Sequence, residues 1–545
     1  MKRKIVIILA MLGLLISAIL GIGFYRKNNI FIWGHTYPLD SQELDFREEE
    51  LSFEQYNELH NQLPNCKILW NVPFQNGKYS SDSESLSITT LTKSDIAVLM
   101  EYFPHLQKVD ASACQDYTML ESLKKQMPEL YVQYMVSLGE KSFSLDSTKL
   151  ILENGDYDFS TMITNLRYLP EISSIQLKNS ELDMEQINNL KDTYPEIMVT
   201  YTVEILGKEY DESTTELDLS AMISEEVPEV CKKLPMLPCL STVELSEQDD
   251  ISHISKEDVQ VLMSTIPQAV FHYSFDFYGE IISTTAEEVY IKNKRIGDEG
   301  EDEVRLALDL MQNCRRFVLD SCQVSNEVMS KIREDYKEKT KIVWRVSFGG
   351  GSALTDVEVI RSTYDLVDDN SKDLIYCEDV RFIDLGHNEY LDAIPFVAGM
   401  PNLEFAIISG APIKDLTPFE NCKKLRILEI AYCSYIDDVS PLASCKDLEM
   451  LNISFTHVTD LTPLDNIGLT HLCAVSPSAR IPIEEQQRFN NLHPDCWAQY
   501  VGDQPYGPGW RYARDNKPLE WYESVCDIFG YPHALNNAGW YLEKN

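Results

Sequence analysis

Residues with the chemistry of a binding surface recur at three equivalent positions of a segment that repeats between Val380 and Ser476. The first position holds Phe382, Phe405, Ile427 and Met450, the second holds Asp384, Ile407, Glu429 and Asn452, and the third holds His387, Tyr432 and Phe455. If successive copies form strands about 4.8 Å apart, the first set makes an apolar ladder flanked by carboxylates and aromatic rings. Such a patch marks an interaction surface, and aromatic side chains are favoured anchors. We therefore predict that these residues, on a concave face, bind a protein or peptide ligand. The alternatives are that a neighbouring segment covers the ladder, or that the ladder is ordinary strand packing.

Motifs for catalysis, cofactors and metals are absent from the sequence. It contains no His-Glu-x-x-His, Gly-x-Ser-x-Gly or Gly-x-x-x-x-Gly-Lys run. The ten histidines are dispersed, and no two of the thirteen cysteines have Cys-x-x-Cys spacing. We therefore expect a protein that is not an enzyme and that uses no cofactor and no metal.

The charge balance also limits the choice of partner. The chain has 87 acidic and 47 basic residues and a formal net charge of −40. Binding of phosphates needs a basic stripe, which the sequence lacks, so nucleic acid is not an expected partner. The acidic surface favours a solvated protein kept apart by self-repulsion.

The elements that must position the predicted contact residues are short repeats. An Asp-x-x-Pro tetrad marks each copy, and the tetrads begin at Asp392, Asp415, Asp438 and Asp460, in steps of 23, 23 and 22 residues. Within Leu425-Arg-Ile-Leu-Glu-Ile the residues Leu425, Leu428 and Ile430 can point inward from a short strand. One such strand cannot bury its apolar face alone, and stacked copies complete the core.

This segment resembles the internalin-type leucine-rich repeats of bacterial surface proteins. The resemblance implies an α/β solenoid, a curved stack of short parallel strands with helices and turns on the convex side, that presents a surface to a ligand. It also implies Asn, Cys or Thr in the turn after each strand. Asn388, Cys433 and Thr456 fit that pattern, and Ala411 departs from it.

A longer repeat of about 64–72 residues precedes the short ones, over residues 51–379. Its marker is a Pro, an alternating strand and a Gly, as in Pro128-Glu-Leu-Tyr-Val-Gln-Tyr-Met-Val-Ser-Leu-Gly139. Each unit predicts strand, strand, helix, strand, helix. We interpret 51–379 as degenerate leucine-rich-like repeats that continue into 380–475. The alternative is a separate α/β domain, joined at 349–351 or at the acidic stretch 365–373.

The amino end predicts a membrane anchor. Residues 5–24 are uncharged and mostly apolar, long enough for one transmembrane helix, and three basic residues precede them. We predict a cytoplasmic tip and uncleaved signal-anchor over 1–27, rather than a cleaved signal peptide. Residues 28–50 would form a stalk. The expected location is the cell membrane, with a single pass and the bulk of the chain outside.

The carboxyl end, 476–545, predicts one more hairpin and an aromatic cap that closes the last repeat. Trp510, Trp521 and Trp540 support a second interpretation, a platform for sugar rings. The sequence as a whole thus predicts a membrane-tethered extracellular protein that binds a protein or other surface ligand, in adhesion or envelope interaction. The alternatives are a surface carbohydrate-binding or carbohydrate-active protein, and a structural spacer whose ladder is covered.

Overall fold

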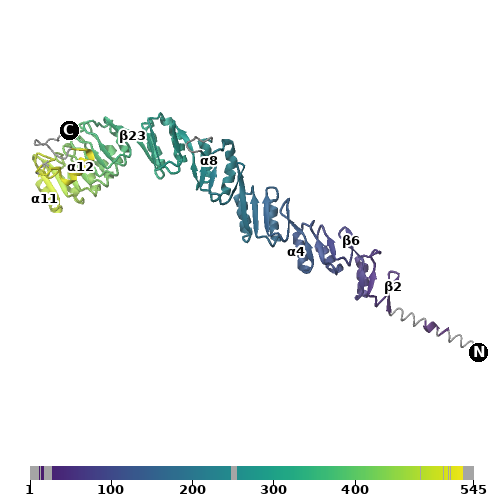
Figure 1. Ribbon diagram of the computed structural model, residues 1–545. Helices are drawn as coiled ribbons and strands as arrows, with labels where there is room; N and C mark the ends of the chain where they lie inside the picture. Colours follow the sequence, from purple (N-terminus) through teal and green to yellow (C-terminus); the bar gives the residue numbers. More distant parts are fainter. Residues whose placement is uncertain are drawn as a thin grey trace, which may run out of the picture. The chain divides into compact units, whose positions relative to one another are not determined.

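The computed structural model describes residues 11–12, 14–17, 28–246, 254–478, 480–506, 508–513, 515 and 517–531. The chain divides into two compact units. One comprises residues 1–214 and 232–239, and the other comprises residues 215–231 and 240–545. In both units short parallel strands alternate along the chain with helices (Figure 1).

In the first unit, small parallel sheets alternate with β-hairpins. Its strands are β1 (Asn29–Ile32), β2 (His35–Pro38), β3 (Glu43–Asp45), β4 (Lys67–Leu69), β5 (Asn71–Phe74), β6 (Gly77–Ser80), β7 (Ser85–Ser87), β8 (Lys108–Asp110), β9 (Tyr131–Gln133), β10 (Met135–Ser137), β11 (Ser142–Ser144), β12 (Lys149–Glu153), β13 (Ser174–Lys178), β14 (Met198–Ile205) and β15 (Lys208–Asp211). The strands β12, β13 and β14 are parallel, and β14 then turns back into the antiparallel partner β15. The two residues of that turn, Leu206 and Gly207, have φ of 49° and 75°, the signs of a type I′ hairpin.

The helices of the first unit are α2 (Phe53–Gln62), α3 (Lys93–Tyr102), α4 (Tyr117–Gln126), α5 (Phe159–Asn165), η1 (Leu166–Tyr168), α6 (Met184–Thr193) and η3 (Leu234–Met236). The α-helices α2 to α6 each begin at a residue whose side chain caps them, whereas the 3-10 helices η1 and η3 have no side-chain cap. Ser52, Thr92 and Asp183 each accept a hydrogen bond from the backbone three residues on, and the side chain there returns the bond. This reciprocal capping satisfies amide groups that a helix start leaves free.

The second unit begins with the same pattern. Its first strands are β16 (Glu216–Asp218), β17 (Thr242–Glu244), β18 (Val270–His272), β19 (Ser274–Phe277), β20 (Glu280–Ser283), β21 (Glu288–Lys292), β22 (Arg316–Asp320), β23 (Lys341–Phe348) and β24 (Gly351–Leu354). The helices are η2 (Ser224–Glu226), α7 (Val227–Lys233, whose last two residues belong to the first unit), α8 (Lys256–Thr265), η4 (Asp298–Gly300), α9 (Glu301–Leu310) and α10 (Asn326–Tyr336). Strands β21, β22 and β23 are parallel, and β23 turns back into β24.

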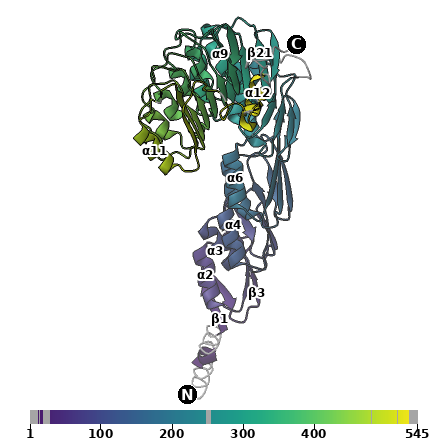
Figure 2. The ribbon, with the colours of Figure 1, turned by 90° about the vertical axis from the view of Figure 1, so that its left-hand side faces the viewer.

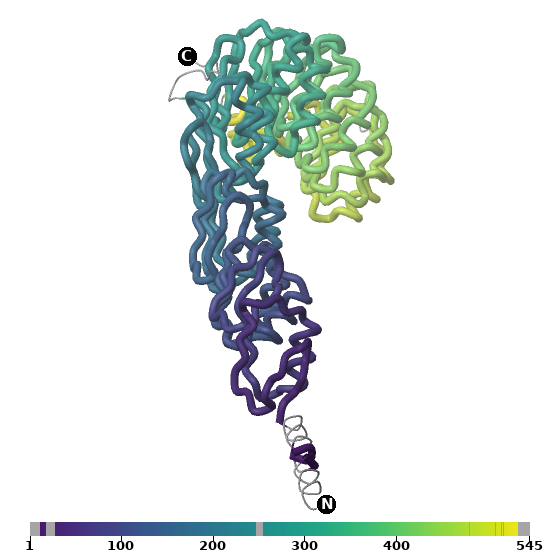
Figure 3. The backbone as a smooth tube through the Cα atoms, turned by 90° about the vertical axis from the view of Figure 1, so that its right-hand side faces the viewer, coloured from purple at the N-terminus to yellow at the C-terminus, as the bar shows by residue number. Residues whose placement is uncertain are grey.

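The short repeats form one seven-stranded parallel sheet (Figures 2 and 3). Its strands are β25 (Val359–Arg361), β26 (Phe382–Asp384), β27 (Phe405–Ile407), β28 (Ile427–Glu429), β29 (Met450–Asn452), β30 (His471–Ser476) and β31 (Trp497–Val501). Between the strands lie η5 (Lys372–Tyr376), η6 (Pro395–Gly399), η7 (Thr417–Asn421), η8 (Ser440–Ser444), η9 (Thr462–Leu464) and α11 (Ile483–Leu492). The sheet therefore includes one strand before residue 380 and one after residue 476.

The Asp-x-x-Pro tetrads build the 3-10 helices. Asp415, Asp438 and Asp460 each accept a 2.8 Å hydrogen bond from the backbone N–H two residues on. The proline of each tetrad stands in the first turn of the helix, where its missing N–H leaves no partner unsatisfied. The tetrad therefore starts a helix as well as ending the strand segment.

The turn residues implied by the family resemblance satisfy backbone groups inside the solenoid. The Asn388 Nδ2 donates to the carbonyls of Ser362 and Leu385, both at 2.9 Å. The Cys433 Sγ contacts a backbone carbonyl oxygen at 3.3 Å, and the Thr456 hydroxyl donates to one at 2.7 Å. A methyl group can do neither, which makes Ala411 the exception in the structure as in the sequence.

The predicted transmembrane anchor needs correction. None of the helices among the described residues has the length and the apolar character to cross a membrane. Of the predicted span 5–24, the structure describes only 11–12 and 14–17, and the rest lies outside the described residues. The N-terminal transmembrane helix, and with it the single-pass membrane location with the bulk of the chain outside, is therefore not kept.

Candidate ligand-binding site

The predicted contact residues lie in register on one face of the short-repeat sheet, which we call the inner face. Aligned across β26 to β29 are Phe382, Phe405, Ile427 and Met450, and likewise Asp384, Ile407, Glu429 and Asn452. The residue between the two positions, such as Leu428, points to the other side and is buried in the solenoid core. The structure thus brings together the first two predicted sets.

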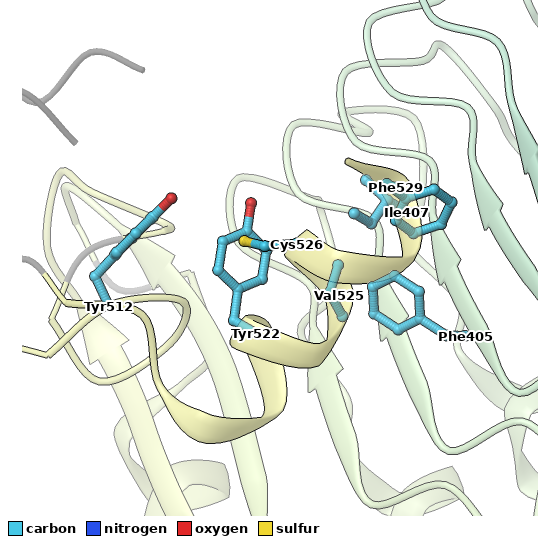
Figure 4. Close-up of a cluster of buried hydrophobic side chains, with 7 residues drawn as sticks. All are labelled: Phe405, Ile407, Tyr512, Tyr522, Val525, Cys526 and Phe529. Carbon is cyan, nitrogen blue, oxygen red and sulfur yellow. The ribbon is translucent and has the colours of Figure 1, made fainter. Parts of the chain in front are cut away.

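The inner face is covered by residues 505–531, which we call the carboxyl segment. Its helix α12 (Glu520–Phe529) packs Val525 and Phe529 against Phe405 and Ile407 (Figure 4). Phe405 and Ile407 are each only 3% exposed as a result. Burying one such side chain stabilises by roughly 1.5–3 kcal/mol. A neighbouring segment therefore covers the apolar ladder, which was one of the alternatives weighed from the sequence.

A second buried cluster holds the start of the carboxyl segment. It consists of Met450, Cys473, Val475 and Trp510. Beside it the Asn452 Nδ2 donates a 2.9 Å hydrogen bond to the Pro505 carbonyl oxygen. The remaining two ladder residues, Phe382 and Ile427, are half-buried against the same segment.

A buried ion pair lies at the centre of this contact. The Glu429 side chain is 0% exposed and is paired with the Arg511 guanidinium. One carboxylate oxygen accepts from Arg511 Nε at 2.9 Å and from Trp510 Nε1 at 2.7 Å. The other accepts from Arg511 Nη2 and from the Ser409 hydroxyl, the latter at 3.2 Å. Because a buried carboxylate is costly unless paired and hydrogen-bonded, Glu429 positions the carboxyl segment rather than a free ligand.

The tryptophans of the carboxyl segment do not present two open ring faces. Trp510 is 1% exposed, and Trp521 is half-buried with its Nε1 donating to the Trp510 carbonyl oxygen at 3.0 Å. The third, Trp540, lies outside the described residues. Since a sugar platform needs exposed faces, Trp510 and Trp521 do not form one in this arrangement.

The third predicted set lies along one edge of the sheet, where His387 and Tyr432 are exposed and Phe455 is partly buried. His387, Tyr432 and Phe455 follow β26, β28 and β29, and Tyr364 occupies the same place after β25. All four have positive φ, between 60° and 72°, although this region is strained for bulky residues. We call Tyr364, His387, Tyr432 and Phe455 the aromatic rim.

The rings of the aromatic rim stack in two pairs. Tyr364 and His387 have centroids 5.0 Å apart and planes within 4°, and Tyr432 and Phe455 are 4.5 Å apart and within 13°. Tyr364 is 73% exposed and Tyr432 is 46% exposed. The carboxyl segment that covers the inner face reaches this edge through Tyr506, whose ring centroid is 6.1 Å from that of Tyr432, and leaves Tyr364 and part of Tyr432 exposed.

A cavity of about 360 Å³ lies between the aromatic rim and the carboxyl segment. Asp384 lines it, together with His387, Ser409 and Tyr506. Burial, opposed by a hydrogen bond from the Gly386 N–H, raises the pKa of Asp384 to about 6. The cavity therefore holds a carboxylate that has lost most of its water.

Cys433 and Cys473 of the short repeats are buried thiols. All thirteen cysteines are free, and burial raises the pKa of Cys433 to about 12 and that of Cys473 to about 11. Thiols of this kind are inert because the thiolate is the reactive form. Over the described part of the chain, three or more His, Cys, Asp or Glu side chains nowhere converge as metal ligands would.

The sequence did not identify Tyr364 and Arg511 in this region, and it predicted Trp510 only as part of a cap or a sugar platform. Tyr364 lies 23 residues before His387, the same step as between the first tetrads, and that spacing could have identified it. Trp510 and Arg511 belong to no repeat, and no spacing links them to Glu429, more than 80 residues earlier.

Parallel strands in register, 3-10 helices opposite them and a polar ladder in the turns define the repeat class. The short repeats therefore have the leucine-rich-repeat fold. No protein-family model and no curated protein matches the chain. Among solved structures it is similar to the internalin InlF of Listeria monocytogenes, with 13% identity over 75% of this chain and 79% of the other, and a TM-score of 0.21.

Two further similarities are of the same kind. A leucine-rich-repeat protein of Leptospira interrogans shares 16% identity over 76% of this chain and 93% of its own, with a TM-score of 0.24. Internalin C2 of Listeria monocytogenes shares 16% identity over 47% and 80%, with a TM-score of 0.20. The repeat assignment itself rests on the register and turns of this chain.

Proposed function

We propose that the chain is a binding protein without catalytic activity, and that it contacts a protein or peptide ligand through the aromatic rim. The observation that carries this proposal is a row of four rings, stacked in two pairs on strained backbone, in which Tyr364 is 73% and Tyr432 is 46% exposed. Positive φ costs a bulky residue of order 1–3 kcal/mol, and such strain clusters at ligand sites. A glycine would relieve the backbone strain at each of these positions. The chain carries a ring there instead, which indicates that the rings have a role.

The inner face has a different part in this proposal. Phe405, Ile407 and Glu429 already contact the carboxyl segment, so a ligand would reach them only by displacing it. The rim needs no such displacement. Adhesion or envelope interaction is the form of binding that we propose, because a repeat scaffold serves to present an extended surface.

A peptide selection tests the proposal. A random peptide library is selected on the full chain, with counter-selection on the double variant Tyr364→Ala/Tyr432→Ala. We expect enriched peptides to bind the wild type and to lose binding to the double variant, because aromatic anchors dominate such contacts. Tyr131→Ala is the matched control, since Tyr131 is 63% exposed and lies in the first unit. Peptides that bind both chains equally, or no enrichment at all, would contradict the proposal.

A further inference from the structure

The aromatic rim has one position without a ring. Gly410 stands where the neighbouring repeats carry His387 and Tyr432, and its φ of 79° matches theirs of 62° and 61°. Its N–H donates to the Ala431 carbonyl oxygen at 2.8 Å, just as His387 and Tyr432 donate to the carbonyls of the next repeats at 2.8 Å. The backbone at Gly410 therefore continues the ladder, and only the side chain is missing.

The backbone leaves room for a Cβ at this position. A Cβ at Gly410 would meet no atom closer than 3.7 Å, and its nearest neighbours belong to His387. His387 and Tyr432 lie two strands apart, about 9–10 Å. One planar ring between them would have the spacing that the chain uses in its own pairs, 5.0 Å and 4.5 Å.

A cavity lies beside this slot, on the side of His387. His387 and Ser409, which flank the slot, also line the cavity of about 360 Å³. A Cβ at Gly386 would lie 3.2 Å from Asp384 Oδ1 and 3.6 Å from the Ser409 carbonyl oxygen. The carboxylate of Asp384 is therefore near the backbone that leads to Gly410.

Asp384 has acceptor capacity left for a ligand. Its Oδ1 accepts from the Gly386 N–H at 2.9 Å, and its Oδ2 accepts no hydrogen bond from the residues that the structure describes. Two guanidinium groups act on this carboxylate electrostatically without a hydrogen bond to it: Arg511 pairs with Glu429, and Arg361 donates to the Phe529 carbonyl oxygen and lies over the Tyr531 ring. A buried acceptor of this kind favours a ligand that brings a donor.

We propose that the slot at Gly410 binds one aromatic side chain with a hydrogen-bond donor, tyrosine or tryptophan, of a peptide partner. The ring stacks between His387 and Tyr432, and its O–H or N–H donates to Asp384. This inference rests on the proposed function and names the anchor that the aromatic rim recognises.

The test uses small probes on the full chain. Saturation-transfer NMR measures binding of N-acetyl-L-tyrosinamide and N-acetyl-L-tryptophanamide, with N-acetyl-L-leucinamide as the apolar control. Gly410→Tyr fills the slot from within, and we expect it to weaken both aromatic probes roughly tenfold or more, because both stacking contacts are lost. Gly410→Asn is the matched control, since Asn tolerates positive φ but carries no ring.

Further variants separate the ring from the donor. Asp384→Asn should reduce the preference for N-acetyl-L-tyrosinamide over N-acetyl-L-phenylalaninamide, because the carboxylate acceptor is lost. If Gly410→Tyr does not fold, as judged by circular dichroism, Gly410→His replaces it with the residue that stands at 387.

Three results would overturn the inference: equal binding of the leucine and aromatic probes, unchanged aromatic binding in the filled variant, or binding of methyl glucoside in place of the aromatic probes. Selected peptides that depend on the rim but not on Gly410 would leave the proposed function standing and reject the slot alone.

Discussion

The inner face and the aromatic rim belong to the same strands and differ in what covers them. Phe405, Ile407 and Glu429 on the inner face are buried under the carboxyl segment. Tyr364 and Tyr432 on the rim remain exposed. Both sets recur with the repeat period, so periodicity alone does not distinguish them. A segment outside the repeats decides which face can meet a ligand.

Breaking the ion pair should have the largest effect on this difference. Arg511→Ala leaves the Glu429 carboxylate buried without a partner, and we expect a loss of about 3–5 kcal/mol in the free energy of unfolding of the carboxyl segment. Hydrogen exchange over 505–531 measures it, as lost protection of that segment. Rim-dependent peptide binding should persist.

The matched control for Arg511 is an exposed ion pair of the same sheet. Arg426 pairs with Glu449 at 2.9 Å, with side chains 55% and 44% exposed. Such pairs are worth about 0–1 kcal/mol, so Arg426→Ala should leave the protection unchanged. Equal effects of the two substitutions would show that the ion pair does not hold the segment.

The pH dependence of stability should come next in size. The pKa of Asp384 is raised from 3.8 to about 6 in the folded chain, so the folded state holds the proton more tightly than the unfolded state does. Stability contributed by this proton is present below about pH 4 and is lost as pH rises towards 6. The loss is about 3 kcal/mol at most.

Asp384→Asn removes that titration. Denaturant unfolding of wild type and variant at pH 4 and pH 7 should show the stability of the variant, relative to wild type, increasing with pH. Arg511, Glu429 and Arg361 also act on Asp384. Arg426→Ala removes a charge elsewhere on the sheet and leaves those three in place. It therefore serves as the control, and its stability should depend on pH as that of the wild type does. A pH-independent difference between Asp384→Asn and wild type would contradict the assignment.

The smallest effect on stability is expected on the rim. Tyr432→Gly relieves positive φ, worth about 1–3 kcal/mol, but loses one stacked pair, about 0.5–1.5 kcal/mol, and adds unfolded-state freedom, about 0.5–1 kcal/mol. These terms nearly cancel, so thermal unfolding should shift little while peptide binding is lost. Phe405→Ala on the inner face is the comparison, with an expected loss of about 3–5 kcal/mol. Comparable destabilisation by both would remove the distinction between the two faces.

The repeat period predicted most of the solenoid but not its coverage. Alternating apolar residues such as Leu425, Leu428 and Ile430 determine where the strand lies, which of its side chains point inward and how it pairs with its neighbours. A shift of one residue would expose the core. Stacking then aligned Phe405 with Ile427 as expected. The docking of the carboxyl segment depends on non-periodic residues, Trp510 and Arg511, whose partners lie far away in sequence.

Other differences between the sequence prediction and the structure concern short sequence patterns, each of which depends on only a few residues. The Asp-x-x-Pro tetrad marks each copy in the sequence, and in the structure it also starts a 3-10 helix because the aspartate accepts a hydrogen bond from the backbone N–H two residues on. Tyr364 was overlooked because the first repeat lacks the tetrad and was recognisable only by spacing. The apolar run 5–24 satisfied a composition rule, but no helix among the described residues could cross a membrane.

The buried pairing of Glu429 with Arg511 also orders events during synthesis. The sheet is translated before the carboxyl segment, so Glu429 lacks its guanidinium until residue 511 is made, and Phe405 lacks its cover until Val525 and Phe529 are made. At about 5–20 residues per second this interval lasts seconds. During this interval the nascent chain exposes an apolar surface of the kind that chaperones bind. A message truncated before codon 511 would leave its product permanently in that state.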